Sequence, residues 1–293
     1  MDTTVATTSI PSWLQEHCHR LVQNDAQLVN INFNLRQLDE AQMQTLCKAL
    51  LENDAIEIVN FTTSFQRSPA ATLSVLSRAV LPFHPSLKIL HLSYNRLQDV
   101  RALGKALESN RNLEELYLDY NQIDCDSAIF LAKGLGRNST LKVLQLNSNS
   151  IGETGGEALG EVLYSRNHTL QRLGLRNNQL GLHSTRAFSE ALSNNYALCV
   201  LELHENHRIP RQCMESLHFL AKANNAGRYA LRDHYFPLAR WSIILENLKP
   251  DMVMFFLGQK PALVPQEHSS VVPMDVIPTS SYRNEESSMD IEH

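Results

Sequence analysis

One phrase of eleven residues, with leucine or a related apolar residue at fixed places, returns seven times between Leu28 and Ile209. Its clearest copies read Leu-x-x-Leu-x-Leu-x-x-Asn and begin at Leu87, Leu113 and Leu141. Successive copies begin 26 to 31 residues apart. A fixed period in this range indicates a solenoid, in which each unit buries its apolar face only against its neighbours. The repeat therefore predicts an elongated stack of similar units rather than one globular core.

Each unit changes its hydrophobic period halfway. The Leu-x-Leu core alternates between inward and outward residues, which is typical of a strand. In the second half apolar residues recur three and four positions apart, as at Leu103, Ala106 and Leu107, which predicts an amphipathic helix of about three turns. We expect the asparagine of each motif to bond backbone groups of adjacent units. Small helical residues such as Gly134 are expected to let the helices approach the strands closely.

A strand and a full helix within 28 or 29 residues resemble the long, ribonuclease-inhibitor-like class of leucine-rich repeats. The resemblance covers residues 28–222. It implies an α/β leucine-rich-repeat solenoid, a right-handed arc with parallel strands on its concave face and helices on its convex face. Ribonuclease inhibitor itself is rich in cysteine and alternates two repeat types, whereas this chain has five cysteines and uses asparagine throughout its well-formed units. We therefore do not carry ribonuclease inhibition over.

The pattern divides the chain into four parts. They are an N-terminal cap helix, about seven leucine-rich repeats, a helical C-terminal cap and a disordered tail, at residues 1–27, 28–222, 223–260 and 261–293. The first two repeats are degenerate, because Arg36 and Ser64 stand where the motif has asparagine. Atypical terminal units are expected, since an end repeat has one neighbour instead of two. The tail is assigned from its proline, serine and acidic residues.

Composition excludes several classes of partner. A net charge of −5 argues against nucleic acid and against an acidic membrane, which both favour a basic surface. No apolar run reaches the roughly 18 residues of a membrane span, and no secretory signal is visible. Five cysteines without a Cys-x-x-Cys pair suggest reduced thiols in the cytoplasm or nucleus, so the sequons at Asn60, Asn138 and Asn167 are not expected to be glycosylated. We expect a monomer.

The sequence contains no pattern that indicates catalysis. His204 and His207 invite a metal interpretation, but their spacing differs from His-Glu-x-x-His and they follow a strand rather than lie on a helix. The glycine-rich stretches contain neither a phosphate-binding loop nor a dinucleotide-binding fingerprint. No Gly-x-Ser-x-Gly elbow is present. We expect no catalytic residues, no metal and no cofactor.

Outward strand residues of successive repeats are expected to form columns on the concave face. His91, Tyr94, Tyr117 and Tyr120 then cluster on adjacent repeats, and two arginines lie between acidic groups. Exposed aromatic residues and arginines often anchor protein interfaces. The predicted partner-binding residues are His91, Tyr94, Glu115, Tyr117, Asp119, Tyr120, Arg172, Arg176, Glu202 and His204. The alternative is a solvated face whose arginines pair with acidic neighbours one or two repeats away.

These patterns favour a non-enzymatic scaffold or adaptor that binds a protein partner on the concave face. The alternative is a regulator of a small GTPase, because similar repeats occur in activators of the GTPase Ran. The few acidic residues of this tail depart from the long acidic tail of those activators, and a GTP-turnover assay separates the two hypotheses. A sensor fragment of the nucleotide-binding receptor type is disfavoured by the missing phosphate loop.

Overall fold

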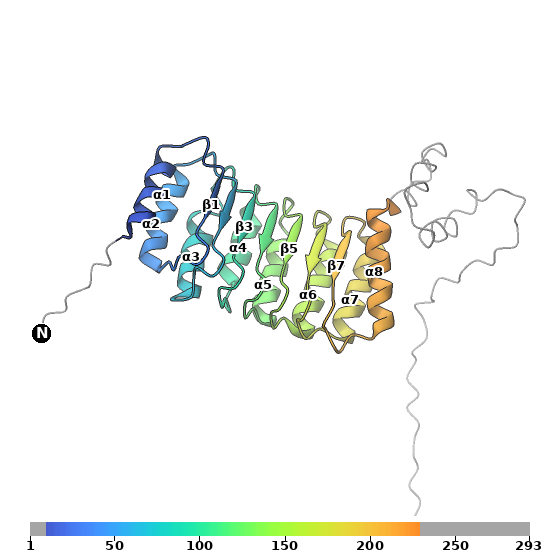
Figure 1. The fold of residues 1–293 in the computed structure, drawn as a ribbon. Coiled ribbons are helices and arrows are strands. Elements are labelled where there is room, and N and C mark those ends of the chain that lie inside the picture. Colours follow the sequence, from blue (N-terminus) through green and yellow to red (C-terminus); the bar gives the residue numbers. More distant parts are fainter. Residues whose placement is uncertain (1–9, 229–293) are drawn as a thin grey trace, which may run out of the picture. The chain divides into compact units, whose positions relative to one another are not determined.

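The computed structural model describes residues 10–228, in which strands and helices alternate (Figure 1). The predicted cap and tail beyond residue 228 lie outside this range. The strands are β1 (Asn30–Asn32), β2 (Ile58–Asn60), β3 (Ile89–His91), β4 (Glu115–Tyr117), β5 (Val143–Gln145), β6 (Arg172–Gly174) and β7 (Val200–Glu202). The helices are α1 (Ser12–Val22), α2 (Glu40–Leu51), α3 (Pro69–Ala79), α4 (Arg101–Ser109), α5 (Cys125–Leu135), α6 (Gly152–Ser165), α7 (Leu182–Asn194) and α8 (Arg211–Asn225).

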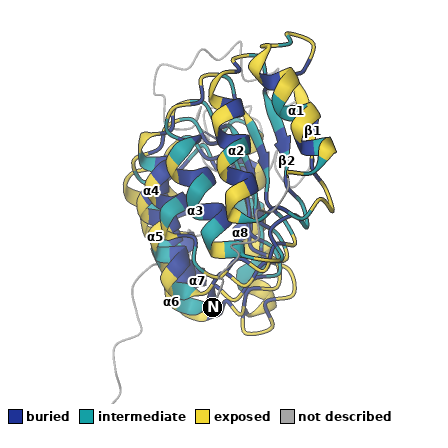
Figure 2. Ribbon diagram, turned by 90° about the vertical axis from the view of Figure 1, so that its left-hand side faces the viewer, coloured by how far each residue is buried: buried dark blue, intermediate teal, exposed yellow. Residues whose placement is uncertain are grey.

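The seven strands form one parallel sheet in chain order. The helices that follow the strands lie along one side of this sheet. This confirms the expected α/β solenoid. Parallel strands lie about 4.8 Å apart and packed helices about 8–10 Å apart. The sheet side is therefore shorter than the helix side, and the stack curves with the strands on its inner face. Figure 2 shows buried and exposed residues on different faces of the helices, as their sequence pattern predicts.

The asparagine of each motif bonds the backbone of the preceding repeat, as expected. In Asn95, Oδ1 accepts the N–H groups of Ser64 and Phe65, both at 2.7 Å, and Nδ2 donates to the carbonyl oxygen of Phe61 at 2.8 Å. The side chain is fully buried. We call this column the strand-exit ladder, and its members are Asn95, Asn121, Asn149, Asn178 and Asn206. In the degenerate second repeat, the Ser64 hydroxyl substitutes by donating to the carbonyl oxygen of Phe33.

A second column of asparagines, which the sequence analysis did not predict, lies where each helix returns to the next strand. In Asn138, Oδ1 accepts the N–H of Leu141 at 2.8 Å and Nδ2 donates to the carbonyl oxygen of Leu107 at 3.0 Å. We call this column the helix-exit ladder, and its members are Asn53, Asn110, Asn138, Asn167, Asn195 and Asn224. Two of them belong to the sequons noted above. Their buried amides hold the fold together and are not available to a glycan.

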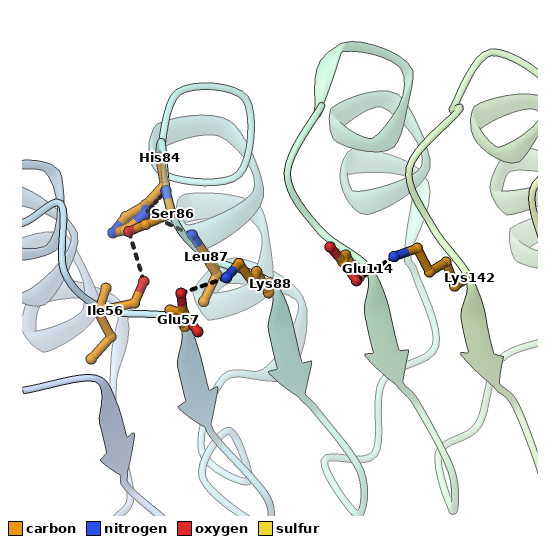
Figure 3. Close-up of polar contacts among 8 residues, drawn as sticks. All are labelled: Ile56, Glu57, His84, Ser86, Leu87, Lys88, Glu114 and Lys142. Carbon is orange, nitrogen blue, oxygen red and sulfur yellow. Dashed lines mark hydrogen bonds and ion pairs between the residues drawn. The ribbon is translucent and has the colours of Figure 1, made fainter.

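His84, between α3 and β3 at the end of the second repeat, takes the place of asparagine in the helix-exit ladder (Figure 3). Its Nδ1 accepts the N–H groups of Ser86 at 3.4 Å and Leu87 at 3.2 Å. Burial lowers the pKa of His84, against smaller opposing influences from the Leu50 backbone and the carboxylate of Asp54. The neutral ring is therefore the form that the fold requires.

Replacing His84 with asparagine is expected to reduce the loss of stability in mild acid. The unfolded chain protonates this histidine near pH 6.5, whereas the folded chain resists protonation. The unfolded state therefore binds more protons, and stability falls as the pH drops below about 6.5. Urea unfolding at pH 7.5 and pH 5.5 measures the effect. The exposed His168, in the corresponding loop at the end of the fifth repeat, is the control. An unchanged pH dependence in His84→Asn, relative to wild type, contradicts this role.

The same edge of the sheet carries side chains of alternating charge, also visible in Figure 3. Lys88 pairs with Glu57 at 2.5 Å, and Lys142 pairs with Glu114 at 2.7 Å. The hydrogen bond from Lys88 to Glu57 is the main reason why the pKa of this lysine is raised. These groups are partly exposed, and solvent screens such surface ion pairs, so they add little to stability. We therefore interpret these ion pairs as contacts that align neighbouring repeats, and not as part of a functional site.

The small helical residues contact neighbouring helices, so the prediction that they bring helices close to strands was wrong. A Cβ atom added to Gly134 in α5 would lie 2.1 Å from the carbonyl oxygen of Gly104 in α4. A Cβ atom added to Gly160 in α6 would lie 2.7 Å from that of Ala187 in α7. Strands and helices of one unit are instead separated by the leucine core. Glycine is used where two helix backbones touch.

Helix α1 covers the first repeat with an aromatic cluster. The Trp13 ring lies 5.9 Å from that of Phe33, and Phe33 stacks on Phe61 at 5.3 Å. Arg36, which stands in the place of the first ladder asparagine, lies over the Trp13 ring at 5.4 Å. Nδ1 of His17 donates a hydrogen bond to the carbonyl oxygen of Trp13 at 2.6 Å. The departures of the first repeat from the motif thus coincide with its contacts to this helix.

Candidate functional site

The candidate site is the outward face of the sheet, which we call the strand face. The register of the sheet aligns Ile89, Glu115, Val143, Arg172 and Val200 in one column. A second column is formed by His91, Tyr117, Gln145, Gly174 and Glu202. These are the columns expected from the repeat alignment. The predicted residues of the third and fourth repeats therefore lie beside each other on one surface.

Two aromatic pairs form the centre of this surface. The His91 and Tyr117 rings stack with centroids 4.5 Å apart and planes at 15°. Tyr94 and Tyr120 stack at 4.4 Å and 8°. The latter two side chains are 48% and 52% exposed, although tyrosine carries a large apolar ring. Exposed aromatic residues that already stack lose little freedom when a partner binds.

The backbone conformation at Tyr94 and Tyr120 explains why their rings project outward. Both residues have positive φ, 61° and 54°, a region that bulky side chains rarely occupy. The N–H of Tyr94 donates to the carbonyl oxygen of Asp119 at 2.9 Å, and that of Tyr120 donates to Asn147 at 2.8 Å. The same position has positive φ throughout the array, at Leu35, Thr63, Tyr94, Tyr120, Ser148, Asn177 and Glu205. The repeat imposes this conformation on whichever residue stands there.

Carboxylates flank the aromatic pairs. The Tyr117 hydroxyl donates to Oε2 of Glu115 at 2.6 Å, and burial together with this carboxylate raises the pKa of Tyr117 to about 12. Burial raises the pKa of Asp119, although Oδ1 accepts the N–H of Asn147 at 2.8 Å. Burial also lowers the pKa of His91, against the opposing charge of Glu115. At neutral pH this half of the face is aromatic and acidic.

The two arginines of the predicted site are ion-paired with the next repeat. Arg172 lies 3.5 Å from Glu202, and Arg176 contacts Glu205. Arg176 also lowers the pKa of Glu205 through this hydrogen bond. All four side chains remain between one third and just over one half exposed. This pairing is the one foreseen for a solvated face, but exposed pairs are weak and can exchange for contacts with a partner.

The remaining predicted residue, His204, follows β7 at the edge of the strand face. Its ring lies 6.3 Å from that of His218 in α8. Between residues 10 and 228, no three histidine, cysteine, aspartate or glutamate side chains gather in a way that could hold a metal ion. No helix in this range is long and apolar enough to cross a membrane.

A shallow, open depression of about 460 Å³ adjoins the aromatic pair Tyr94 and Tyr120. Its other lining residues are Thr63, Gln66 and Arg96. The amide of Gln66 donates to the carbonyl oxygen of Tyr94 at 2.5 Å and so joins the second repeat to the third. Gln66 and Arg96 were not predicted as site residues, because they lie beyond the strands, where each chain segment leads to its helix. The depression is too open to exclude water, so its shape suits contact with another surface.

Comparison with known proteins gives the same repeat. Residues 85–130 match a family model of leucine-rich repeats in two copies, and residues 137–160 match a single leucine-rich repeat. The chain is 29% identical to a protein phosphatase 1 regulatory subunit 37 homolog of Caenorhabditis elegans, over 57% of this chain and 18% of the relative. It is 26% identical to human NACHT, LRR and PYD domains-containing protein 13, over 67% of this chain and 19% of the relative.

A third relative is the ribonuclease inhibitor of Sus scrofa, 33% identical over 42% of this chain and 27% of the relative. The chain therefore spans less than one third of the length of each of these three proteins. The similarity lies in the repeats that they share with it.

Proposed function

Because this chain is a leucine-rich-repeat protein of the long, ribonuclease-inhibitor-like subtype, we propose that it is a non-enzymatic scaffold or adaptor that binds a protein partner on its strand face. Solenoids of this kind offer a preformed concave surface, and a rigid surface loses little entropy on binding. The relatives include a phosphatase regulatory subunit and an inhibitor, whose names describe action through another protein.

The observation that carries the proposal is the pair of exposed, stacked tyrosines, Tyr94 and Tyr120, in a strained backbone conformation. A polar residue such as Asn177, in the same position of the sixth repeat, meets the conformational demand at lower cost. Two adjacent tyrosines add ring surface that the fold itself does not need. Tyrosine is among the residues that dominate the binding energy of interfaces.

The compartment proposed for this interaction is the cytoplasm or nucleus, with the chain as a monomer. All five cysteines are free, and Cys47 is buried with a pKa raised to about 12 by desolvation. Free thiols persist where the redox environment is reducing. Light scattering of the purified chain measures its oligomeric state.

Replacing Tyr94 and Tyr120 together with asparagine is expected to reduce capture of native partners at least about tenfold. Loss of each interface anchor costs about 1 kcal/mol or more of binding free energy. The two losses add, so the dissociation constant rises by about a factor of ten or more. Asparagine keeps the backbone conformation, as Asn177 demonstrates. Capture from the source cell is quantified by mass spectrometry after proximity labelling has identified the partners.

Tyr164 provides a matched control, since it is also a tyrosine, is 48% exposed and lies on helix α6. Tyr164→Ala should leave capture unchanged. Equal recovery of every partner by the strand-face variant and wild type would contradict the proposal. So would a greater loss in Tyr164→Ala.

A further inference from the structure

The depression beside Tyr94 and Tyr120 arises from a change of residue at one position of the repeat. The position that carries these tyrosines carries Thr63 in the second repeat, so the surface drops from two large rings to a small side chain. Thr63 has a φ of 58°, which a β-branched residue rarely adopts. We call the hollow of about 460 Å³ the tyrosine depression, and its lining residues are Thr63, Gln66, Tyr94, Arg96 and Tyr120.

The tyrosine depression is lined by hydrogen-bond donors that lack acceptors. In the described part of the chain, the Thr63 hydroxyl and the Arg96 guanidinium make no hydrogen bond. Burial, together with the neighbouring Tyr120 hydroxyl, raises the pKa of Tyr94. Two hydroxyl groups carry two hydrogens and can use only one of them within their pair. At least one tyrosine hydroxyl is therefore left to donate to an outside acceptor.

The charge in the tyrosine depression is positive. Arg96 is exposed, and among residues 10–228 it has no acidic partner within ion-pair distance. No carboxylate lines the depression. Asp119 precedes Tyr120 in the chain, but it is not a lining residue and its Oδ1 accepts the N–H of Asn147. This local positive charge stands against a net charge of −5 for the whole chain.

The later repeats pair their polar side chains at the same place. Asn177 donates to the Ser148 hydroxyl at 3.4 Å, and Arg176 pairs with Glu205. Three of these residues belong to the column with positive φ that also holds the two tyrosines. The arginine of the sixth repeat is thus matched within the fold, whereas Arg96 of the third repeat is not.

We propose that the tyrosine depression receives a carboxylate of the protein partner, from an aspartate or glutamate side chain, held by the Arg96 guanidinium and by the hydroxyl groups of Tyr94 and Tyr120. An ionised carboxylate only accepts hydrogen bonds, and bonds between ionised groups are about twice as strong as neutral ones. This inference rests on the proposed function, since it names the chemistry of the partner at the same surface. Basic and purely apolar partner segments are the competing outcomes of its test.

The test uses a random peptide library displayed on phage, selected on the immobilised full chain and counter-selected on Tyr94→Asn/Tyr120→Asn. The retained peptides, which depend on the tyrosine pair, are expected to share an aspartate or glutamate. The net charge of −5 would by itself attract basic peptides. Replacing the shared acidic residue with its amide should weaken binding about 5-fold to 50-fold. Arg96→Gln should weaken the acidic peptide by a similar factor and leave the amide peptide unaffected.

Arg78→Gln is the charge-matched control, because it removes an exposed arginine of helix α3 that also has no ion pair among residues 10–228. Retained peptides that ignore Arg96, or that share a basic or apolar residue instead, overturn this inference and leave the proposed function standing. An equal loss in Arg78→Gln has the same meaning, since it indicates general charge attraction. The absence of any peptide that distinguishes wild type from the tyrosine variant counts against both.

Discussion

Replacing Asn121 with alanine is expected to lower the free energy of unfolding by about 2–4 kcal/mol. The side chain accepts the N–H groups of Asn95 at 2.9 Å and Leu97 at 3.1 Å, and donates to the carbonyl oxygens of Leu92 and Leu118. Alanine leaves these backbone groups without partners inside the stack, and each such group costs about 1–3 kcal/mol where no water can replace the bond. Urea unfolding followed by circular dichroism measures the loss.

Asn34 is the matched control, because it lies at the exit of β1, is exposed and makes no side-chain hydrogen bond in the described structure. Asn34→Ala should change stability by less than about 0.5 kcal/mol. If Asn121→Ala is as stable as Asn34→Ala, the strand-exit ladder does not hold the repeats together. Because each repeat contacts only its neighbours, hydrogen exchange in Asn121→Ala should increase first in the third and fourth repeats.

Gly134→Ala is expected to destabilise the chain by about 1–3 kcal/mol, although alanine is the better helix former. The new Cβ atom would lie 2.1 Å from the carbonyl oxygen of Gly104, and a backbone oxygen cannot move aside as a flexible side chain does. Helices α4 and α5 must separate, which loosens the leucine core that lies between these helices and the strands. The measurement is again urea unfolding, with the heat-induced transition as a second readout.

Gly136 separates this packing effect from helix propensity. A Cβ atom there would lie 3.4 Å from Cδ of Arg166 and 3.5 Å from the carbonyl oxygen of Lys133, which is ordinary contact. Gly136→Ala is therefore expected to be neutral or slightly stabilising. Equal effects at Gly134 and Gly136 would show that the approach of α4 and α5 does not limit stability.

The regular part of the fold can be predicted from the sequence, because every repeat carries the same pattern of apolar residues and asparagine. The Leu-x-Leu cores give the strands, and the columns on the strand face follow from alignment of the motifs. Asn149 and Asn178 could be assigned to backbone bonding before any coordinates were known, since an inward polar residue at a turn has few other uses. Comparison of the repeats with each other thus shows which residues point inward and which point outward, as an alignment of related proteins otherwise would.

Features that depend on contact between units were less accessible. Asn138 belongs to a sequon, so its role in the helix-exit ladder was not recognised from the sequence. His84 replaces asparagine in the same ladder, and this interruption makes the column of asparagines harder to detect. The partner of Gly134 was misassigned, because a small residue indicates close approach without saying to what. The pairing of Arg172 with Glu202, rather than with Glu115, depends on side-chain conformations that spacing alone does not determine.

We propose that the strand face binds a protein. The most direct measurement is the dissociation constant of one purified native partner for wild type, Tyr94→Asn/Tyr120→Asn and Tyr164→Ala, by isothermal titration calorimetry. We predict at least about tenfold weaker binding for the strand-face variant and unchanged binding for the helix-face control. Equal dissociation constants for wild type and the strand-face variant, both fully folded, would show that the strand face is not the binding surface.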